Sequence, residues 1–271
     1  MLQTDAFKLD DYLQRIAYTG DVRPDSDCLK SIIRAHGQAI PFENLDVMAY
    51  GTINLEPEHL VNKIVYGGRG GYCYEVNAIV YLALQAAGFT VQLVAARPRI
   101  FPVLRPRTHM AVVAELDGQY WLCDPAFGGQ MPAEPICLAS PEEEICQGAD
   151  YFKITLDAGQ GEYYLYSKVD GDWQAQYSFT LNHQEWVDFA PGNYLNSTHP
   201  DSFFRQQPAM VIFTAEGRNL LFGNRLKIMK NGVTETRLLS KDEFDSVFQT
   251  HFRVTGNYTF NPDNVPETRP K

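Results

Sequence analysis

The chain has 271 residues, 45% of them hydrophobic and 13% aromatic, so it can bury a sizeable core and is long enough for two or more domains. Its formal net charge of -10 argues against nucleic acids and anionic membranes as main partners, because both are polyanions. The five cysteines include no Cys-x-x-Cys pair and no zinc-ligand spacing, so we expect no metal site and a reducing compartment.

About the first ninety residues place apolar side chains at helical spacing. The predicted helices lie near residues 12–16, 25–33, 56–65 and 73–87. Residues 1–13 lack the basic and apolar regions of a signal peptide, and no apolar run is as long as a membrane span. We therefore expect a cytoplasmic protein.

The fourth predicted helix begins at Cys73, directly after a loop with four glycines between residues 67 and 71. A helix N-terminus carries unpaired N–H groups and partial positive charge, and both favour the thiolate, which is the nucleophilic form of cysteine. Glycines let the loop turn sharply and let a substrate approach the backbone closely. These features predict a nucleophile, whereas the alternative for a lone cysteine is a small buried hydrophobic residue.

From Thr90 onward the apolar residues alternate, which predicts strands. Six candidates at short spacing favour a small barrel or sandwich, at residues 90–96, 109–116, 119–124, 151–156, 163–168 and 173–179. A mixed region from about Asn193 contains further strand candidates at residues 209–214, 226–230 and 235–239. A capping-box pattern at Ser240 and Glu243 predicts a helix from Ser240, and we expect the polar tail after Thr255 to be loosely ordered.

The dipeptide Asp117-Gly118 between two alternating runs predicts a two-residue hairpin turn. If Leu116 pairs with Gln119, His109 and Asp124 become diagonal neighbours on one face of the hairpin. Such neighbours have Cβ atoms about 7–8 Å apart, which is within reach of a side-chain hydrogen bond. The alternative for a single histidine near a strand end is an exposed or merely satisfied side chain.

Together with Cys73, this pair makes a cysteine–histidine–aspartate arrangement. In such a triad the histidine takes the thiol proton, and the aspartate holds the imidazole tautomer and stabilises the imidazolium. The sequence pattern alone does not bring Cys73 to His109, because the two residues lie in separate elements.

These segments resemble motifs of the arylamine N-acetyltransferases. Residues 69–77, Arg-Gly-Gly-Tyr-Cys-Tyr-Glu-Val-Asn, resemble the nucleophile motif of that family, and residues 41–46, Pro-Phe-Glu-Asn-Leu-Asp, resemble an upstream signature. Residues 108–109 and 124–128 resemble the histidine and aspartate segments, and residues 196–204 resemble a motif early in the third domain. The matches occur in the family's order and span most of the chain.

The resemblance implies an α+β fold with a papain-like cysteine-triad core. It implies an N-terminal helical bundle at residues 1–88 that contains the nucleophile, and a central antiparallel β-barrel at residues 89–192 that contains the histidine and the aspartate. Residues 193–271 would then form an α/β lid with an interdomain segment. No long insertion separates barrel and lid, so the layout resembles the compact bacterial type.

The resemblance also implies ping-pong chemistry, with acetyl-coenzyme A as co-substrate and no bound cofactor. Cys73 would be acetylated and coenzyme A released, and an arylamine, arylhydrazine or N-hydroxyarylamine would then accept the acetyl group. His109 would act as the base and Asp124 as its orienting partner.

Arg69 lies next to the glycine loop and needs a planar acceptor, so we expect a buried pair with Glu43. The alternative is a solvated surface pair worth less than about 1 kcal/mol. One departure from the family is visible at Pro125-Ala126, where Val-Gly is usual. Proline removes a backbone donor beside the triad, which bears on coenzyme A seating and acceptor range.

Two further segments are candidates for binding substrate or coenzyme A. The run Phe127-Gly128-Gly129 offers backbone N–H groups to an acyl carbonyl or a phosphate, although it is also compatible with an ordinary turn. Phe204 falls within a matched motif, where an aromatic amine could stack.

Three other functions remain open from the sequence. A papain-like or transglutaminase-like enzyme would use the same triad on peptide or glutamine acyl groups without coenzyme A. An amide synthase would act on a carrier-bound acyl chain and share the motifs. A non-enzymatic binding module is disfavoured, because all three triad residue types are present.

Overall fold

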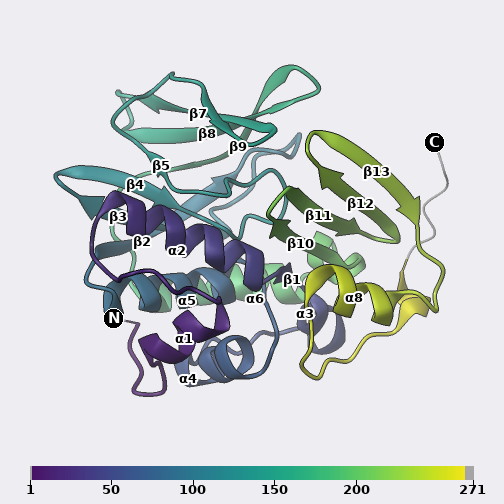
Figure 1. The fold of residues 1–271 in the computed structure, drawn as a ribbon. Helices are drawn as coiled ribbons and strands as arrows, with labels where there is room; N and C mark the ends of the chain where they lie inside the picture. The colour runs from purple at the N-terminus through teal and green to yellow at the C-terminus, as the bar shows by residue number, and fades with distance from the viewer. Residues whose placement is uncertain (1, 266–271) are drawn as a thin grey trace.

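The computed structural model describes residues 2–265, in which helices pack beside two antiparallel sheets (Figure 1). The helices of the N-terminal part are α1 (Leu9–Arg15), α2 (Ser26–Ala39), α3 (Leu45–Tyr50), α4 (Pro57–Val61), the π-helical turn η1 (Asn62–Tyr66) and α5 (Cys73–Ala86). Helix α2 begins where the sequence predicted, and Asp25 caps it by accepting the N–H of Cys28 at 2.8 Å. The first twelve residues of α5 are all buried, so α5 is the central helix of the molecule.

The larger sheet has eight strands in the order β5-β4-β3-β2-β9-β8-β7-β6. The strands are β2 (Thr90–Pro98), β3 (His109–Leu116), β4 (Gln119–Cys123), β5 (Ile136–Cys137), β6 (Ile145–Gln147), β7 (Asp150–Asp157), β8 (Glu162–Val169) and β9 (Asp172–Phe179). The six predicted strands are confirmed, whereas the short β5 and β6 escaped prediction. The sheet is open at β5 and β6 and curls as a half-barrel (Figure 1).

Both faces of strand β3 are buried, because the sheet separates two apolar clusters. Ala111 and Val113 face the inside of the half-barrel with Leu122 and Phe152. Met110, Val112 and Ala114 alternate with them and join the cluster that contains α5. Side chains alternate between the two faces of a strand, so β3 links the half-barrel to the helix that begins at Cys73.

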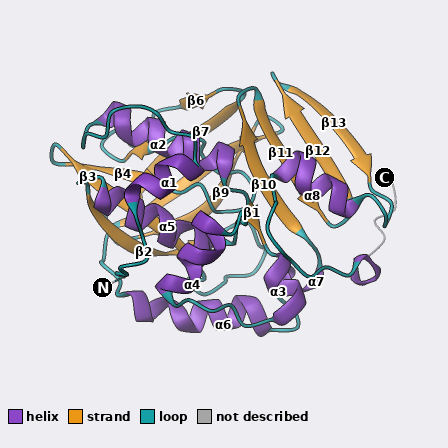
Figure 2. Ribbon diagram, turned by 60° about the horizontal axis from the view of Figure 1, so that its bottom comes forward, coloured by secondary structure: helices purple, strands orange, loops and turns teal. Residues whose placement is uncertain are grey.

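The smaller sheet has the order β1-β10-β11-β12-β13. Its strands are β1 (Phe42–Glu43), β10 (Ala209–Thr214), β11 (Gly217–Phe222), β12 (Arg225–Lys230) and β13 (Val233–Leu238). Helix α8 (Phe244–Phe252) covers one face of it with Phe244, Val247, Phe248 and Phe252 (Figure 2). Because β1 comes from the N-terminal part, segments far apart in the sequence share this sheet.

Between the two sheets the chain forms η2 (Trp186–Phe189), α6 (Ala190–Thr198) and α7 (Phe203–Gln206), and η3 (Pro262–Asn264) lies close to the C-terminus. Within residues 2–265 no helix combines the length and apolar character needed to cross a membrane.

Two predictions about the C-terminal part were wrong. The predicted helix at Ser240 begins at Phe244, because the Glu243 carboxylate accepts both the N–H and the hydroxyl of Ser240 and closes a turn before the helix. The segment after Thr255 is docked rather than loose. Gly256 donates its N–H to the carbonyl of Gly68 at 3.3 Å, and Val265 is buried. The tail prediction for residues 266–271 lies outside the described residues.

Candidate active site

Cys73 is the first residue of α5 and is 3% exposed. The preceding residue, Tyr72, has an extended backbone and donates its N–H to the Glu75 carboxylate at 3.0 Å, which closes the first turn of the helix. Gly70 has to be glycine, because a Cβ there would collide with the carbonyl of Pro41. The loop therefore delivers the thiol to a helix N-terminus, as the sequence predicted.

The predicted hairpin register is confirmed, with Leu116 opposite Gln119. The His109 Nε2 atom lies 2.7 Å from Oδ2 of Asp124, and both residues are buried. Since Nε2 is engaged by the carboxylate, Nδ1 is the ring nitrogen that remains for the Cys73 thiol. Pro125 does not disturb this end of the hairpin, because Ala126 donates its N–H to Oδ1 of Asp124 at 3.2 Å.

Asn77 belongs to the motif at residues 69–77, but no role was predicted for it. Its Nδ2 donates to Oδ1 of Asp124 at 2.8 Å and to the carbonyl of Met110 at 2.6 Å. It lies four residues after Cys73, and residues at that spacing share one face of a helix. That spacing was the signal available in the sequence. The amide ties α5 to the hairpin and fixes the second oxygen of the carboxylate.

The electrostatics of the pair favour the charged forms of both residues. Burial lowers the pKa of His109, but the Asp124 carboxylate and the neighbouring Cys73 sulfur outweigh it and raise the pKa to about 10. Burial raises the pKa of Asp124, but His109 and the Asn77 amide outweigh it and hold the pKa below its ordinary value. The imidazole is therefore held as an imidazolium close to the thiol.

A second set of buried charges lies on the other side of the same loop. We call it the ion-pair cluster, and its members are Glu43, Asp46, Lys63, Arg69 and Glu75. The predicted pair is confirmed, with Nε and Nη2 of Arg69 both on Oε1 of Glu43 at 2.9 and 2.7 Å. The same guanidinium reaches Asp46 at 2.8 Å, and Lys63 bonds Glu75 at 2.6 Å.

Mutual pairing favours the charged forms of Lys63 and Asp46, whereas at Glu75 burial outweighs Lys63 and raises the pKa of the carboxyl. Burial lowers the pKa of Lys63, but the carboxylates of Glu75, Glu43 and Asp46 outweigh it and leave the pKa well above its ordinary value. Burial raises the pKa of Asp46, but Lys63 and Arg69 outweigh it and hold the pKa below its ordinary value. Buried charges paired in this way fix the loop without facing a ligand.

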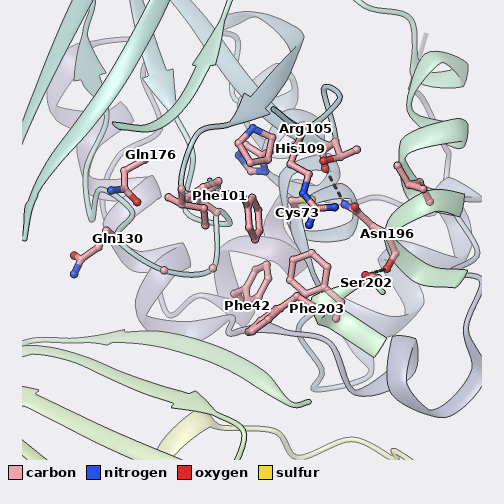
Figure 3. Close-up of a pocket in the computed structure, with 18 of the residues that line it drawn as sticks. Phe42, Cys73, Phe101, Arg105, His109, Gln130, Gln176, Asn196, Ser202 and Phe203 are labelled. Carbon is pink, nitrogen blue, oxygen red and sulfur yellow. Dashed lines mark hydrogen bonds between the residues drawn. The ribbon is translucent and has the colours of Figure 1, made fainter. Parts of the chain in front are cut away.

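A cavity of about 570 Å³ opens onto Cys73 and His109 (Figure 3). Six phenylalanines contribute to its walls, namely Phe42, Phe101, Phe127, Phe203, Phe204 and Phe222. Polar groups also reach it, namely Gln130, Gln174, Gln176, Asn196 and Ser202. Aromatic walls with a few polar groups are typical of a site for a small organic molecule.

The candidate binding residues all line this cavity. Gly128 has φ 87°, a backbone conformation that residues with a side chain rarely adopt. A Cβ at this position would also collide with the ring of Phe42. Phe127 packs its ring 5.0 Å from that of His109. Phe204 packs 6.1 Å from Phe42 and edge-on to Tyr72, so it belongs to the wall as well as to the cavity surface.

Across residues 2–265 no three histidine, cysteine, aspartate or glutamate side chains are grouped as metal ligands. All five cysteines are free thiols.

Known proteins resemble this chain in both sequence and fold. A family model described as N-acetyltransferase matches residues 25–258. An arylamine N-acetyltransferase of Mycolicibacterium smegmatis is 34% identical over 239 residues, which cover 85% of each chain. The solved arylamine N-acetyltransferase from Salmonella typhimurium has a TM-score of 0.88 at 27% identity, with 96% of both chains covered. The Mycobacterium marinum arylamine N-acetyltransferase in complex with CoA has a TM-score of 0.84 at 30% identity, with 91% of this chain and 93% of that chain covered.

Proposed function

The chain belongs to the arylamine N-acetyltransferase family, and we propose that it acetylates arylamines, arylhydrazines or N-hydroxyarylamines through an acetyl-Cys73 intermediate. The observation that supports this most directly is the buried His109–Asp124 pair, which opens onto the same cavity as the thiol. Acetyl-coenzyme A is the donor, in line with the relative solved in complex with CoA. No metal or resident cofactor enters the reaction.

In the first half-reaction, the Cys73 thiolate attacks the thioester carbonyl carbon of acetyl-coenzyme A. A carbon–sulfur bond to Cys73 forms, and the resulting oxyanion is stabilised by backbone N–H groups of Gly128 and Gly129. The carbon–sulfur bond to coenzyme A then breaks. The leaving thiolate takes the proton from Nδ1 of His109, so the imidazole becomes neutral.

In the second half-reaction, the lone pair of the acceptor nitrogen, or of the hydroxylamine oxygen, attacks the acetyl carbon on Cys73. The acceptor loses its proton to Nδ1 of His109, and the carbon–sulfur bond to Cys73 breaks. The thiolate and the imidazolium are thereby restored. Asp124 keeps the ring oriented through both steps, and Asn77 keeps Asp124 in place.

The finer description of the fold is part of the same proposal. A thiol at a helix N-terminus beside a histidine on a strand supports a papain-like core. Residues 1–88, 89–192 and 193–271 would form the bundle, the barrel and the lid, although β1 crosses the first boundary to pair with β10. Five free thiols agree with a reducing compartment, and the cytoplasmic location remains a prediction.

The proposal is tested by intact mass after mixing the protein with acetyl-coenzyme A and quenching at short times, with Cys73→Ser as control. We expect one added acetyl group on the wild type, removed when an arylamine is supplied, and none on the variant. A variant that still produces acetylated amine at the wild-type rate would show that the nucleophile lies elsewhere. Release of coenzyme A without acetylated amine would point to hydrolysis instead of transfer.

A further inference from the structure

Among the described residues that line the cavity containing Cys73, Arg105 is the one arginine or lysine, and it lies on the connection between β2 and β3. Within residues 2–265 its guanidinium has no carboxylate partner. Its neighbours differ, because Arg99 and Arg107 both approach the buried carboxylate of Glu162, at 3.4 and 3.8 Å. Three arginines therefore lie on this connection, and within the described residues only Arg105, which lines the cavity, lacks an acidic partner.

Two contacts and one backbone restriction hold Arg105 in place. Arg97 donates a hydrogen bond to its carbonyl oxygen. Its guanidinium carbon lies 4.9 Å from the centre of the Phe101 ring, a cation–π contact that orients the charged group. Pro106 follows directly and restricts the backbone of the residue before it. The guanidinium is therefore positioned at the cavity before any ligand arrives, although the residue itself is exposed.

The surroundings of Arg105 favour an aromatic ligand with one negative charge. Figure 3 draws the arginine in the same cavity as Cys73, with the rings of Phe42 and Phe203 below them. The other acidic or basic side chain of the lining, histidines aside, is Asp201, which is exposed and forms no ion pair with Arg105. A planar guanidinium beside apolar walls matches a carboxylate in both charge and shape.

The charge of the whole chain makes this local group important. A protein with a net charge of -10 repels anions at long range, so an anionic substrate needs a cation at the site itself. The triad cannot provide it, because the imidazolium of His109 is already compensated by Asp124.

We propose that Arg105 selects aromatic amines that bear a carboxylate, with the amine at the acetyl group of Cys73 and the carboxylate on the guanidinium. The inference rests on the transferase function proposed above and narrows its acceptor class. Two ligands could present an anionic oxygen to Arg105, namely the carboxylate of the acceptor and the phosphates of coenzyme A. We assign Arg105 to the acceptor, and the experiment separates the two.

The test compares kcat/KM for 4-aminobenzoate with that for its neutral methyl ester, in wild type, Arg105→Gln and Arg107→Gln. The ratio of the two values is compared between proteins, so the intrinsic difference in amine reactivity cancels. Loss of a charge-assisted hydrogen bond should lower the ratio about tenfold in Arg105→Gln. The Arg107→Gln control should keep the wild-type ratio, because Arg107 does not line the cavity. Arg105→Lys should restore part of the preference, and added salt should weaken it in the wild type.

An unchanged ratio in Arg105→Gln overturns the inference. So does a raised KM for acetyl-coenzyme A with an unchanged ratio, because the arginine would then serve the donor's phosphates. If the wild type acetylates the ester but not the acid, the acceptor class is wrong while the transferase function stands. If it acetylates neither, with acetyl-Cys73 absent from the mass spectrum, the proposed function fails and the inference fails with it.

Discussion

Two sets of buried polar side chains meet at the start of α5, one on each side of the glycine loop. The triad side consists of His109, Asp124 and Asn77, and the opposite side is the ion-pair cluster. Both contain carboxylates held charged in the interior. In the cluster every charge is paired with another, whereas on the triad side the second histidine nitrogen faces a thiol and a cavity. The triad side can therefore catalyse a reaction because one ring nitrogen of His109 is free to exchange a proton with the thiol or a ligand. Burial and charge alone do not provide this.

The largest expected effect comes from replacing the Cys73 thiol, which only the triad side faces. Cys73→Ser should lower acetyl transfer by on the order of a thousandfold or more, because a serine hydroxyl is far less ionised than a cysteine thiol. The melting temperature should stay close to that of the wild type, because the two side chains are nearly the same size. Steady-state assays with acetyl-coenzyme A and an arylamine measure this. Cys146→Ser, at an exposed thiol away from the cavity, is the matched control and should keep wild-type turnover.

On the cluster side the expected effect is on stability. Arg69→Met leaves Glu43 and Asp46 short of a buried partner and should cost about 3–5 kcal/mol in the free energy of unfolding. Urea denaturation measures it. The matched control is Arg34→Met, which removes the exposed pair with Glu134 and should cost less than about 1 kcal/mol. Equal losses in the two variants would show that the cluster acts as an ordinary surface pair.

The pH dependence of stability sharpens the contrast further. The folded-state pKa of His109, about 10, exceeds its ordinary value of 6.5, so its stabilisation is complete below pH 6.5 and is lost as the pH rises toward 10. We expect wild type to lose on the order of 2–4 kcal/mol more than His109→Gln across that window.

Denaturation curves at the two ends of the window provide the measurement. His183→Gln, at an exposed histidine, should behave as wild type. Parallel pH profiles for wild type and His109→Gln would mean that the imidazole is not held charged by Asp124.

The smallest effect concerns the positioning of the triad. Asn77→Ala removes one donor from Asp124 and one tie to Met110, and should lower kcat about tenfold while leaving KM for acetyl-coenzyme A unchanged. The matched control is Asn219→Ala, which removes a buried amide that donates to the carbonyl of His251 in α8. If both variants lose kcat equally, the effect of Asn77 is general destabilisation rather than positioning.

The triad side was more predictable from sequence than the cluster side. A tight turn at Asp117-Gly118 fixes the register of two adjacent strands, so His109 and Asp124 could be paired from local information. The contact of Arg69 with Asp46 and the ion pairs of Lys63 were missed, because Asp46 and Lys63 come from separate helices whose approach is set by packing.

Two other features left no recognisable pattern in the sequence. Strand β1 has two residues, too few for alternation to show, and it pairs with residues far along the chain. The segment after Val254 docks through backbone hydrogen bonds to Gly68, and backbone groups are the same in every residue. Composition alone therefore made this segment resemble a loose tail.

That docking has a consequence for when the enzyme becomes active. The loop that presents Cys73 is held on one side by β1, which needs β10 as its partner, and on the other by Thr255 and Gly256. During synthesis the N-terminal helices and the half-barrel leave the ribosome long before either of these supports exists. The surroundings of the thiol therefore remain incomplete until residues 255 and 256 have been synthesised, and chains that end before them should not consume acetyl-coenzyme A.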